Sequence, residues 1–155
     1  MKNKCIILIL FSIVFIFIHC ESNQKKETYN ANFTYKGKIT PGKWLKNIKV
    51  PYTHRGKKLF VKAQIYFPKN YKIKSAVRTV IALHDYLSNE RKWEIYTDIE
   101  KYADQFTIAV VCPNMSTTVY ESNFFPETRT KWAKIPGSVF IRPFLIKYIR
   151  STFNL

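Results

Sequence analysis

Two unbroken apolar runs, each ending in polar residues, most strongly restrict the fold of this chain. They are "RTVIALH" at 78–84 and "TIAVVCP" at 107–113. Runs without polar alternation are typical of strands buried on both faces, as in a parallel sheet. The segment between them repeats apolar residues at intervals of three and four, which predicts one amphipathic helix: Trp93, Tyr96, Ile99, Ala103 and Phe106. Strand, helix and strand in this order predict a crossover unit with parallel strands, in which Ser88 or Asn89 caps the helix.

An antiparallel hairpin is predicted before this unit. Residues 48–52 alternate apolar and polar side chains, and residues 59–67 do the same over a longer stretch. The segment that links them contains Gly56, as hairpin loops often do. Proline cannot donate a ladder hydrogen bond, so Pro51 places its strand at or near a sheet edge.

A second helix is predicted at the end of the chain. Residues 138–153 carry an apolar stripe at helical spacing, with Ser138 as the candidate cap. Pro143 would then lie near the first turn, where a missing N–H is tolerated. The whole pattern predicts an α/β layered fold, an antiparallel hairpin followed by β-α-β-α.

The first nineteen residues have the pattern of a signal peptide rather than of a folded domain. A short basic start is followed by a 14-residue apolar run, residues 5–18. This run is shorter than the roughly 20 residues that span a bilayer, and it fits a secretory signal. Cys20 comes just after the run and precedes a polar stretch, which is similar to a bacterial lipoprotein signal. We therefore expect cleavage before Cys20 and a lipid on this residue.

This interpretation divides the chain into three parts. They are a signal peptide at 1–19, a polar tether at 20–43 and an α/β domain at 44–155. It predicts a protein of the bacterial cell envelope, held to the membrane by its lipid anchor. An ordinary or uncleaved signal sequence in which Cys20 is incidental stays open, and the ordinary one would give a secreted or periplasmic protein.

The chain carries a formal charge of +16, from 26 basic and 10 acidic residues. Its lysines are scattered singly, with no basic helix and no aromatic platform for bases. A basic patch on one face is the footprint of nucleic-acid binding, and none is visible in the sequence, so we expect no nucleic-acid partner. Contact with an anionic membrane surface fits the predicted anchor better.

The remaining polar and sulfur groups predict no cofactor. Cys112 is the one cysteine within the predicted domain, so it has no disulfide partner there, and its apolar run predicts a buried, unreactive thiol. No His, Cys and Asp cluster has metal-ligand spacing, and no glycine-rich loop suits a phosphate. On the predicted helix, a solvated face is expected for Asp98, Glu100 and Asp104.

The order and spacing of these segments resemble the opening of an α/β-hydrolase. The branch most similar includes feruloyl-esterase-like and polyhydroxyalkanoate-depolymerase-like enzymes, in which a strand ends in His-Gly-X and a helix carries "TD.E.YAD". This chain has His84-Asp85-Tyr86, then "TDIEKYAD" at 97–104, and Pro113 after the next strand. Residues 144–155 resemble the helix before the nucleophile strand. The resemblance implies the N-terminal half of an α/β-hydrolase sheet, incomplete, and an esterase that acts through serine.

The family's catalytic groups are not found in this sequence. Such enzymes use a serine in a G-x-S-x-G turn, followed along the chain by an acid and a histidine. None of the 4 glycines lies two residues before or after a serine. The histidines, at positions 19, 54 and 84, do not match the family's terminal catalytic histidine. We therefore expect no catalytic residue within the chain.

The resemblance implies half of an oxyanion hole. In the family one backbone N–H comes from the loop after the His-Gly strand. That loop maps onto His84, Asp85 and Tyr86, and Tyr86 is the candidate donor. Asp85 stands where the family has glycine, so its carboxylate would oppose a developing oxyanion. A structural role in bonding the loop backbone is favoured for His84. Pocket-lining or packing roles stay open for Phe124, Phe125 and Trp132.

Three functions stay open on these grounds. The chain is a truncated or split serine esterase that is inactive alone, a non-catalytic binding or scaffold lipoprotein, or one chain of a two-chain esterase. In the last case a C-terminal complementing chain supplies serine, acid and histidine, and a small ester binds only the completed protein. The strand at 78–84 disfavours the scaffold, since the family pairs its second edge with the nucleophile strand. That apolar edge would otherwise be open to water.

Overall fold

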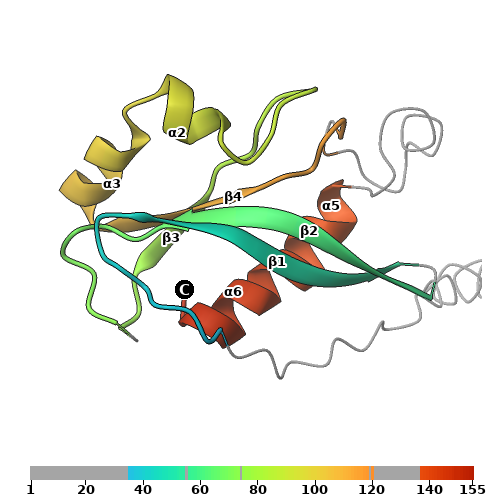
Figure 1. The fold of residues 1–155 in the computed structure, drawn as a ribbon, viewed down its shortest axis with the longest axis horizontal. Helices are drawn as coiled ribbons and strands as arrows, with labels where there is room; N and C mark the ends of the chain where they lie inside the picture. The colour runs from blue at the N-terminus through green and yellow to red at the C-terminus, as the bar shows by residue number, and fades with distance from the viewer. Residues whose placement is uncertain (1–34, 55, 74, 119, 121–136) are drawn as a thin grey trace, which may run out of the picture.

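The computed structural model describes residues 35–54, 56–73, 75–118, 120 and 137–155, which form a four-stranded mixed sheet between helices (Figure 1). The strand order is β1-β2-β4-β3. Their bounds are β1 Trp44–His54, β2 Lys57–Tyr66, β3 Arg78–Ile81 and β4 Ile108–Pro113. β2 is antiparallel to both β1 and β4, and β3 is parallel to β4. The predicted mixed α/β fold is confirmed, whereas the predicted signal peptide at 1–19 and Cys20 lie outside the described residues.

Strands β1 and β2 form the predicted hairpin because their side chains alternate between the two faces of the sheet. In β1 the buried set faces one core: Ile48, Val50 and Tyr52. Gly56 follows β1 with φ +76°, a conformation that glycine adopts without strain. A bulge lies between Leu45 and Ile48, where Asn47 has φ 59°. The edge position predicted from Pro51 is confirmed, since β1 is the outermost strand on its side.

The crossover from β3 to β4 contains two short helices, so the prediction of a single helix is wrong. They are α2, Lys92–Tyr96, and α3, Ile99–Phe106. The chain is extended at Thr97, with φ −144° and ψ 163°. The Thr97 hydroxyl donates to the Trp93 carbonyl at 2.6 Å and accepts from the Ile99 N–H at 3.3 Å. Such bonds compete with the helical ladder, and they divide the predicted helix here.

The predicted starts of both helices are displaced in the structure. Helix α2 begins at Lys92, and Asn89 accepts the Arg91 N–H at 2.9 Å before the helix rather than capping it. The second helix begins at Gly137, one residue before Ser138, as α5, Gly137–Phe140. It continues through a π-helical turn, η1, Ile141–Leu145, into α6, Ile146–Phe153. The wide turn surrounds Pro143, which cannot donate an N–H to the helical ladder.

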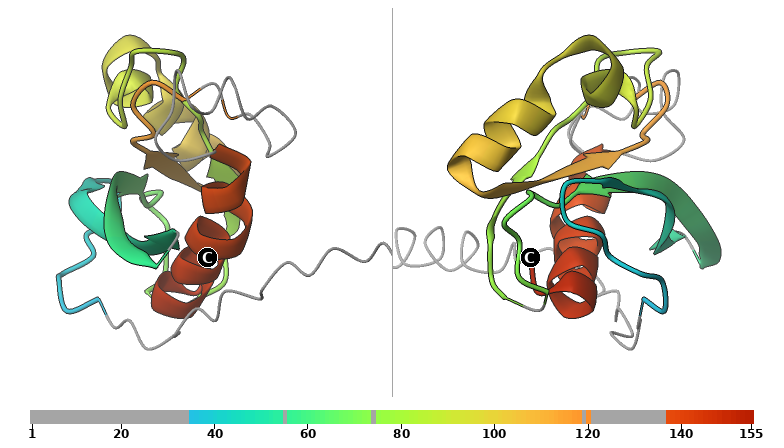
Figure 2. Two further views of the ribbon diagram at one scale, coloured as in Figure 1. Left: turned by 90° about the vertical axis from the view of Figure 1, so that its right-hand side faces the viewer. Right: turned by 60° about the vertical axis from the view of Figure 1, so that its left-hand side comes forward.

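The helices cover both faces of the sheet, which gives three layers (Figure 2). The α5–η1–α6 helix packs on one face, where its buried Phe140, Phe144 and Leu145 meet the apolar side of the hairpin. Helices α2 and α3 pack on the other face over a smaller cluster: Tyr66, Ala82, Ala103, Val110 and Cys112. Two-sided burial explains why β4 reads as a continuous apolar run. None of the helices within the described residues is long and apolar enough to cross a membrane.

Candidate functional site

His84 is a buried clamp between the loops that follow β3 and β4. The residue is 3% exposed, and its Nε2 accepts the Met115 backbone N–H at 2.9 Å. Because Nε2 accepts, the ring proton lies on Nδ1, which donates to the Asp85 carbonyl at 2.7 Å. Both ring nitrogens are therefore occupied by backbone groups. This matches the structural role expected for His84 and leaves neither nitrogen to act as a general base.

Asp85 directs its carboxylate to solvent, where it pairs with Lys92. The Asp85 Oδ2 lies 2.8 Å from the Lys92 Nζ, and the Asp85 side chain is 62% exposed. The hydrogen bond from Lys92 lowers the pKa of Asp85 below its usual value. The left-handed backbone position of this loop falls at Leu87, with φ 63°, and not at Asp85. The aspartate therefore replaces glycine here without a positive φ.

Apolar side chains are exposed along β3 and the loop that follows it. Val80 is 47% exposed in the strand, and in the loop the exposed residues are Leu83, Tyr86 and Leu87. Strand β3 lies at the outer edge of the sheet and pairs with β4 alone among the described strands. An edge with unpaired backbone groups and apolar side chains is a template for another strand. The predicted pairing of 78–84 with 107–113 on one side is confirmed.

A cluster of polar residues around Glu90 connects this loop to β2 and to the residue that follows β4, and the sequence did not predict it. Glu90 is 4% exposed, and its carboxylate lies 2.9 Å from the Lys62 Nζ of β2. Its other oxygen accepts from the Asn114 Nδ2 at 2.6 Å. Burial acts to raise the pKa of Glu90, but the bonds to Lys62, backbone and Asn114 bring it below its usual value. No local spacing links these residues, because they come from three different segments.

Two of the carboxylates expected on a solvated face instead hold α3 against the hairpin, so that expectation is wrong for them. Glu100 accepts from the Trp44 indole N–H. Asp104 accepts from the Tyr66 hydroxyl and from the Lys69 backbone N–H, each at 2.9 Å. Burial, and then the bond to Asp104, raise the pKa of Tyr66. Glu100 and Asp104 therefore position the crossover against β1 and the end of β2.

The other candidate groups supply no nucleophile. Cys112 is buried, as predicted, and burial followed by the charges of Glu94 and Glu90 raises its pKa to about 12, so its thiol stays protonated. No group of three or more His, Cys, Asp or Glu side chains that could hold a metal occurs in the part of the chain that the structure describes. The predicted pocket aromatics lie outside the described residues: Phe124, Phe125 and Trp132.

Two hollows in the described surface lie away from the loop at 84–86. One, of about 510 Å³, is lined by the acidic side of α3 and by Lys69 and Lys101. The other, of about 610 Å³, lies between residues 35–39, the loop at 71–73 and the end of α6. Neither includes a residue of the predicted oxyanion loop in its lining. The candidate site is an exposed loop beside an open strand edge.

No protein-family model matches the chain, and no curated protein matches it. Among solved structures, it is similar to FphF, a fluorophosphonate-binding serine hydrolase of Staphylococcus aureus solved with substrate bound. The identity is 25% over 49% of this chain and 31% of that chain, with a TM-score of 0.37. It is also similar to S-formylglutathione hydrolase (FrmB) of Staphylococcus aureus, an apoenzyme, at 18% identity over 76% of this chain and 45% of that chain, with a TM-score of 0.45. The chain thus spans less than half the length of either enzyme, and the similarity to these α/β-hydrolase esterases covers part of the chain.

Proposed function

We propose that this chain forms the oxyanion-hole side of a carboxylic-ester hydrolase, and that a strand bearing the catalytic serine adds to the free edge of β3. The observation that carries this proposal is that edge, where Val80 is 47% exposed and β4 is the single described neighbour. Parallel strands of α/β proteins are normally buried among other strands and helices. The exposed, apolar edge of β3 therefore suits the addition of a further strand.

The loop at 84–86 would then lie beside the serine, because α/β sheets bind ligands at the carboxyl ends of their strands. The serine Oγ attacks the ester carbonyl as its proton passes to the complementing segment's histidine, and the carbonyl oxygen becomes an oxyanion. The Tyr86 N–H donates one hydrogen bond to it, and the N–H after the serine donates the second. The alcohol leaves with a proton from the complementing segment's histidine, and water then hydrolyses the acyl-serine.

In this arrangement the chain's own residues hold the loop in place. His84 ties it to the loop after β4 through the Met115 N–H. The ion pair of Lys92 with Asp85 neutralises the carboxylate that replaces the family's glycine. Preorganised backbone donors stabilise a transition state because they need no rearrangement during the reaction. These contacts support a positioning function without supplying the nucleophile, the acid or the base.

The purified full chain is expected to hydrolyse p-nitrophenyl acetate no faster than buffer. Sequencing of the adjoining DNA and transcript is expected to find a segment encoding G-x-S-x-G, in the same frame, another frame or a neighbouring reading frame. Co-expression with that segment is expected to raise ester hydrolysis at least about a hundredfold, the order of effect that assembled oxyanion and nucleophile groups produce. Robust hydrolysis by the chain alone would contradict the proposal.

A pair of substitutions tests whether β3 carries the contact. Val80→Lys places a charge on the free edge and should abolish activation by the complementing segment. Phe60→Lys changes a side chain that is 64% exposed on β2, an inner strand, and should leave activation intact. If no G-x-S-x-G segment exists, the non-catalytic scaffold function replaces this one. If the segment activates the Val80→Lys chain equally well, the free edge of β3 is not the contact between the two.

We also propose that Cys20, outside the described residues, carries a lipid that anchors the protein to the bacterial envelope. The apolar run at 5–18 followed by this cysteine supports the proposal. Metabolic labelling with a fatty-acid analogue is expected to label the wild-type chain and the Cys112→Ala variant. Labelling should be lost in Cys20→Ala. A Cys20→Ala chain that is labelled as strongly as wild type would overturn the anchor.

A further inference from the structure

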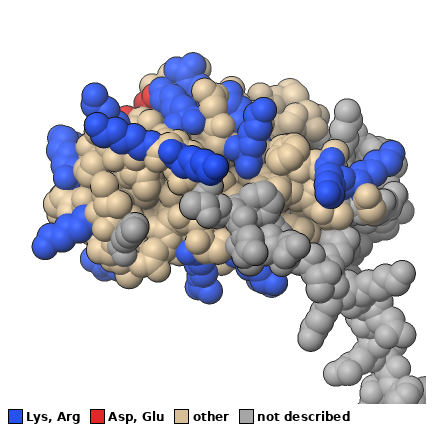
Figure 3. Space-filling model, turned by 60° about the horizontal axis from the view of Figure 1, so that its bottom comes forward, with Lys and Arg blue, Asp and Glu red and all other residues tan. Residues whose placement is uncertain are grey.

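The acidic residues of the described chain all lie in one segment, the crossover that forms α2 and α3. They are Asp85, Glu90, Glu94, Asp98, Glu100 and Asp104. Residues 28–84 and 128–155 contain no Asp or Glu. Helix α6 covers the opposite face of the sheet, so within the described residues the elements on that side contribute no Asp or Glu side chain. Figure 3 shows Lys and Arg spread over the side away from α2 and α3.

The π turn aligns three of these cations along the outer surface of the terminal helix. The Ile146 N–H bonds to the Ile141 carbonyl, five residues back, as a π turn requires. This wide turn brings residues 142 and 147 to the same side, and residue 150 follows 147 by three positions. The three side chains are exposed: Arg142, Lys147 and Arg150. The buried residues of η1 and α6 point the other way, toward the sheet.

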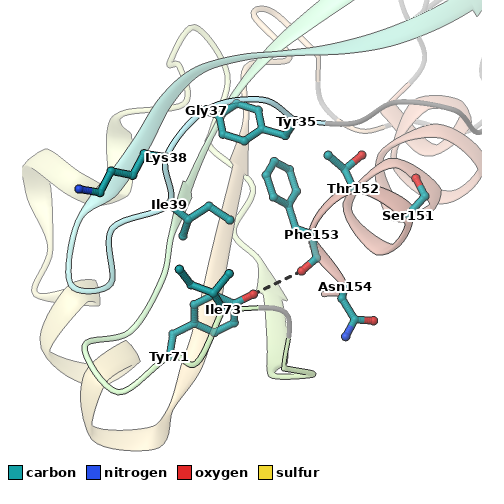
Figure 4. A pocket seen from close by; sticks show the side chains of 10 residues that line it. All are labelled: Tyr35, Gly37, Lys38, Ile39, Tyr71, Ile73, Ser151, Thr152, Phe153 and Asn154. Carbon is teal, nitrogen blue, oxygen red and sulfur yellow. Dashed lines mark hydrogen bonds between the residues drawn. The ribbon is translucent and has the colours of Figure 1, made fainter.

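Three more exposed lysines surround the carboxyl end of α6, and an apolar groove lies among them. Lys36 and Lys38 belong to the segment that enters the fold, and Lys72 follows the buried Tyr71. The groove of about 610 Å³ is lined in part by Ile39, Ile73 and Phe153 (Figure 4). We call Lys36, Lys38, Lys72, Arg142, Lys147 and Arg150 the basic face. Among the described residues, none of the six forms an ion pair.

We propose that the basic face docks on an anionic lipid bilayer. Lipid phosphates would supply the negative charge that this side lacks, since it has no Asp or Glu among its described residues. Each basic residue near such a surface strengthens binding about fivefold. Ile73, 58% exposed beside Lys72, and the apolar groove suit the headgroup and acyl boundary. Binding of single-stranded nucleic acid relies on aromatic platforms. The ring of Phe153 is buried here, and within the described residues the exposed aromatic side chains lie elsewhere: Phe60, Tyr86, Tyr96, Tyr102 and Phe106.

The path of the chain supports the same orientation. Tyr35, where the described fold begins, packs against Phe153 at the end of α6, with ring centroids 5.4 Å apart. Cys20, the proposed lipid site, precedes Tyr35 in the chain and therefore connects to the domain at the basic face, a step that rests on the proposed anchor. A tether of this kind raises the local concentration of the surface, so that weak docking becomes effective.

Lysine footprinting of the full chain in vesicles tests the proposal. The chain is reconstituted in phosphatidylcholine vesicles with or without about 30% phosphatidylglycerol, and acetylation by an N-hydroxysuccinimide ester is followed residue by residue. Lys36, Lys38, Lys72 and Lys147 are expected to react at least about fivefold more slowly in the anionic vesicles. Lys49 and Lys101 should react equally in both. Protection should disappear in about 0.5 M salt, which screens the attraction.

Matched variants distinguish an effect of the basic face from an effect of the protein's net charge. Arg142→Gln, Lys147→Gln and Arg150→Gln together should weaken docking on the order of a hundredfold, about fivefold for each cation removed. Lys49→Gln, Lys58→Gln and Lys101→Gln remove the same charge on the other side of the sheet and should leave protection unchanged. Lys49 opposes Lys62 in the β1–β2 ladder, and Lys62 binds Glu90 on that side.

If a variant fails to fold, the footprint of the wild-type chain alone tests whether the basic face docks on the bilayer. Equal protection of both lysine sets, equal protection in uncharged vesicles, or no protection would overturn the proposal. Protection of the same lysines by a duplex or single-stranded oligonucleotide, but not by anionic vesicles, would overturn it in favour of a nucleic-acid partner.

Discussion

Replacement of His84 by alanine is expected to lower the free energy of unfolding by about 2–4 kcal/mol, the cost of leaving buried backbone groups without partners. The ring accepts the Met115 N–H at 2.9 Å and donates to the Asp85 carbonyl at 2.7 Å, and the residue is 3% exposed. Alanine leaves the Met115 N–H without its acceptor and opens a void between two loops. Urea unfolding of the full chain, followed by tryptophan fluorescence, measures the loss.

Two further variants make this result interpretable. The amide oxygen of His84→Gln can reach the Met115 N–H, so this change should cost about half as much as alanine. Gln105→Ala alters an exposed residue and should change stability by no more than about 0.5 kcal/mol. If His84→Ala proves as mild as Gln105→Ala, the histidine is not the clamp between the two loops. The proposed oxyanion loop would then lack its main support.

Lowering the pH from about 6 to about 3 is expected to release α2 and α3 from the sheet before α6. Burial alone would raise the pKa of Glu90, Glu94 and Asp104, but hydrogen bonds outweigh it and all three pKa values lie below the usual ones. Their principal partners are Lys62 for Glu90, Lys46 for Glu94, and the Lys69 backbone N–H for Asp104. These bonds join the crossover to the hairpin.

The direction of the pH effect follows from these lowered values. A carboxyl group with a lowered folded pKa stabilises the fold above its unfolded pKa, and this contribution is lost as the pH falls through the folded value. The loss therefore begins near the unfolded values, 4.5 for Glu and 3.8 for Asp, and continues below them. Neutral pH retains the full contribution.

Hydrogen exchange read by mass spectrometry distinguishes the two helical layers. Exchange rates are first corrected for the intrinsic effect of pH on exchange. Once the carboxyls are protonated, the amides of 92–106 should open about tenfold more often for each unit by which the fold lowers a carboxyl pKa. Amides of α6 serve as the internal control, because that helix contains no carboxyl side chain. Loss of protection in α6 at the same pH as in α2 and α3 would show that the layers unfold together.

Local patterns predicted the elements that depend on periodicity. Alternation revealed the hairpin, because β1 and the middle of β2, residues 61–63, bury one face, and the unbroken run of β4 revealed burial on both faces. The break at Thr97 was not predicted, since it results from hydroxyl bonds to the backbone rather than from side-chain periodicity. Pro143 was expected near the first turn of the helix. The helix starts at Gly137, and Pro143 lies beyond that turn, within the π turn η1.

The candidate loop was found from the sequence, but its supports were not. A buried strand that ends in His84, Asp85 and Tyr86 is visible in the residue order alone. The partner of His84 lies 31 residues away, and Asn114 reaches Glu90 across 24 residues. Contacts between residues so distant in the chain leave no periodic signal, so they became visible only when β3 and β4 were placed side by side.

The order of residues was sufficient to establish a layered α/β chain without a G-x-S-x-G turn, because burial on one or two faces leaves a repeat that local sequence retains. The distribution of charge was decided by the tertiary structure. Six cations from separate parts of the sequence come together around α6, while every described Asp and Glu lies on the opposite side with α2 and α3. The six are Lys36, Lys38, Lys72, Arg142, Lys147 and Arg150. The reason is the sheet itself, which separates the crossover from the terminal helix and so assigns each to a different surface.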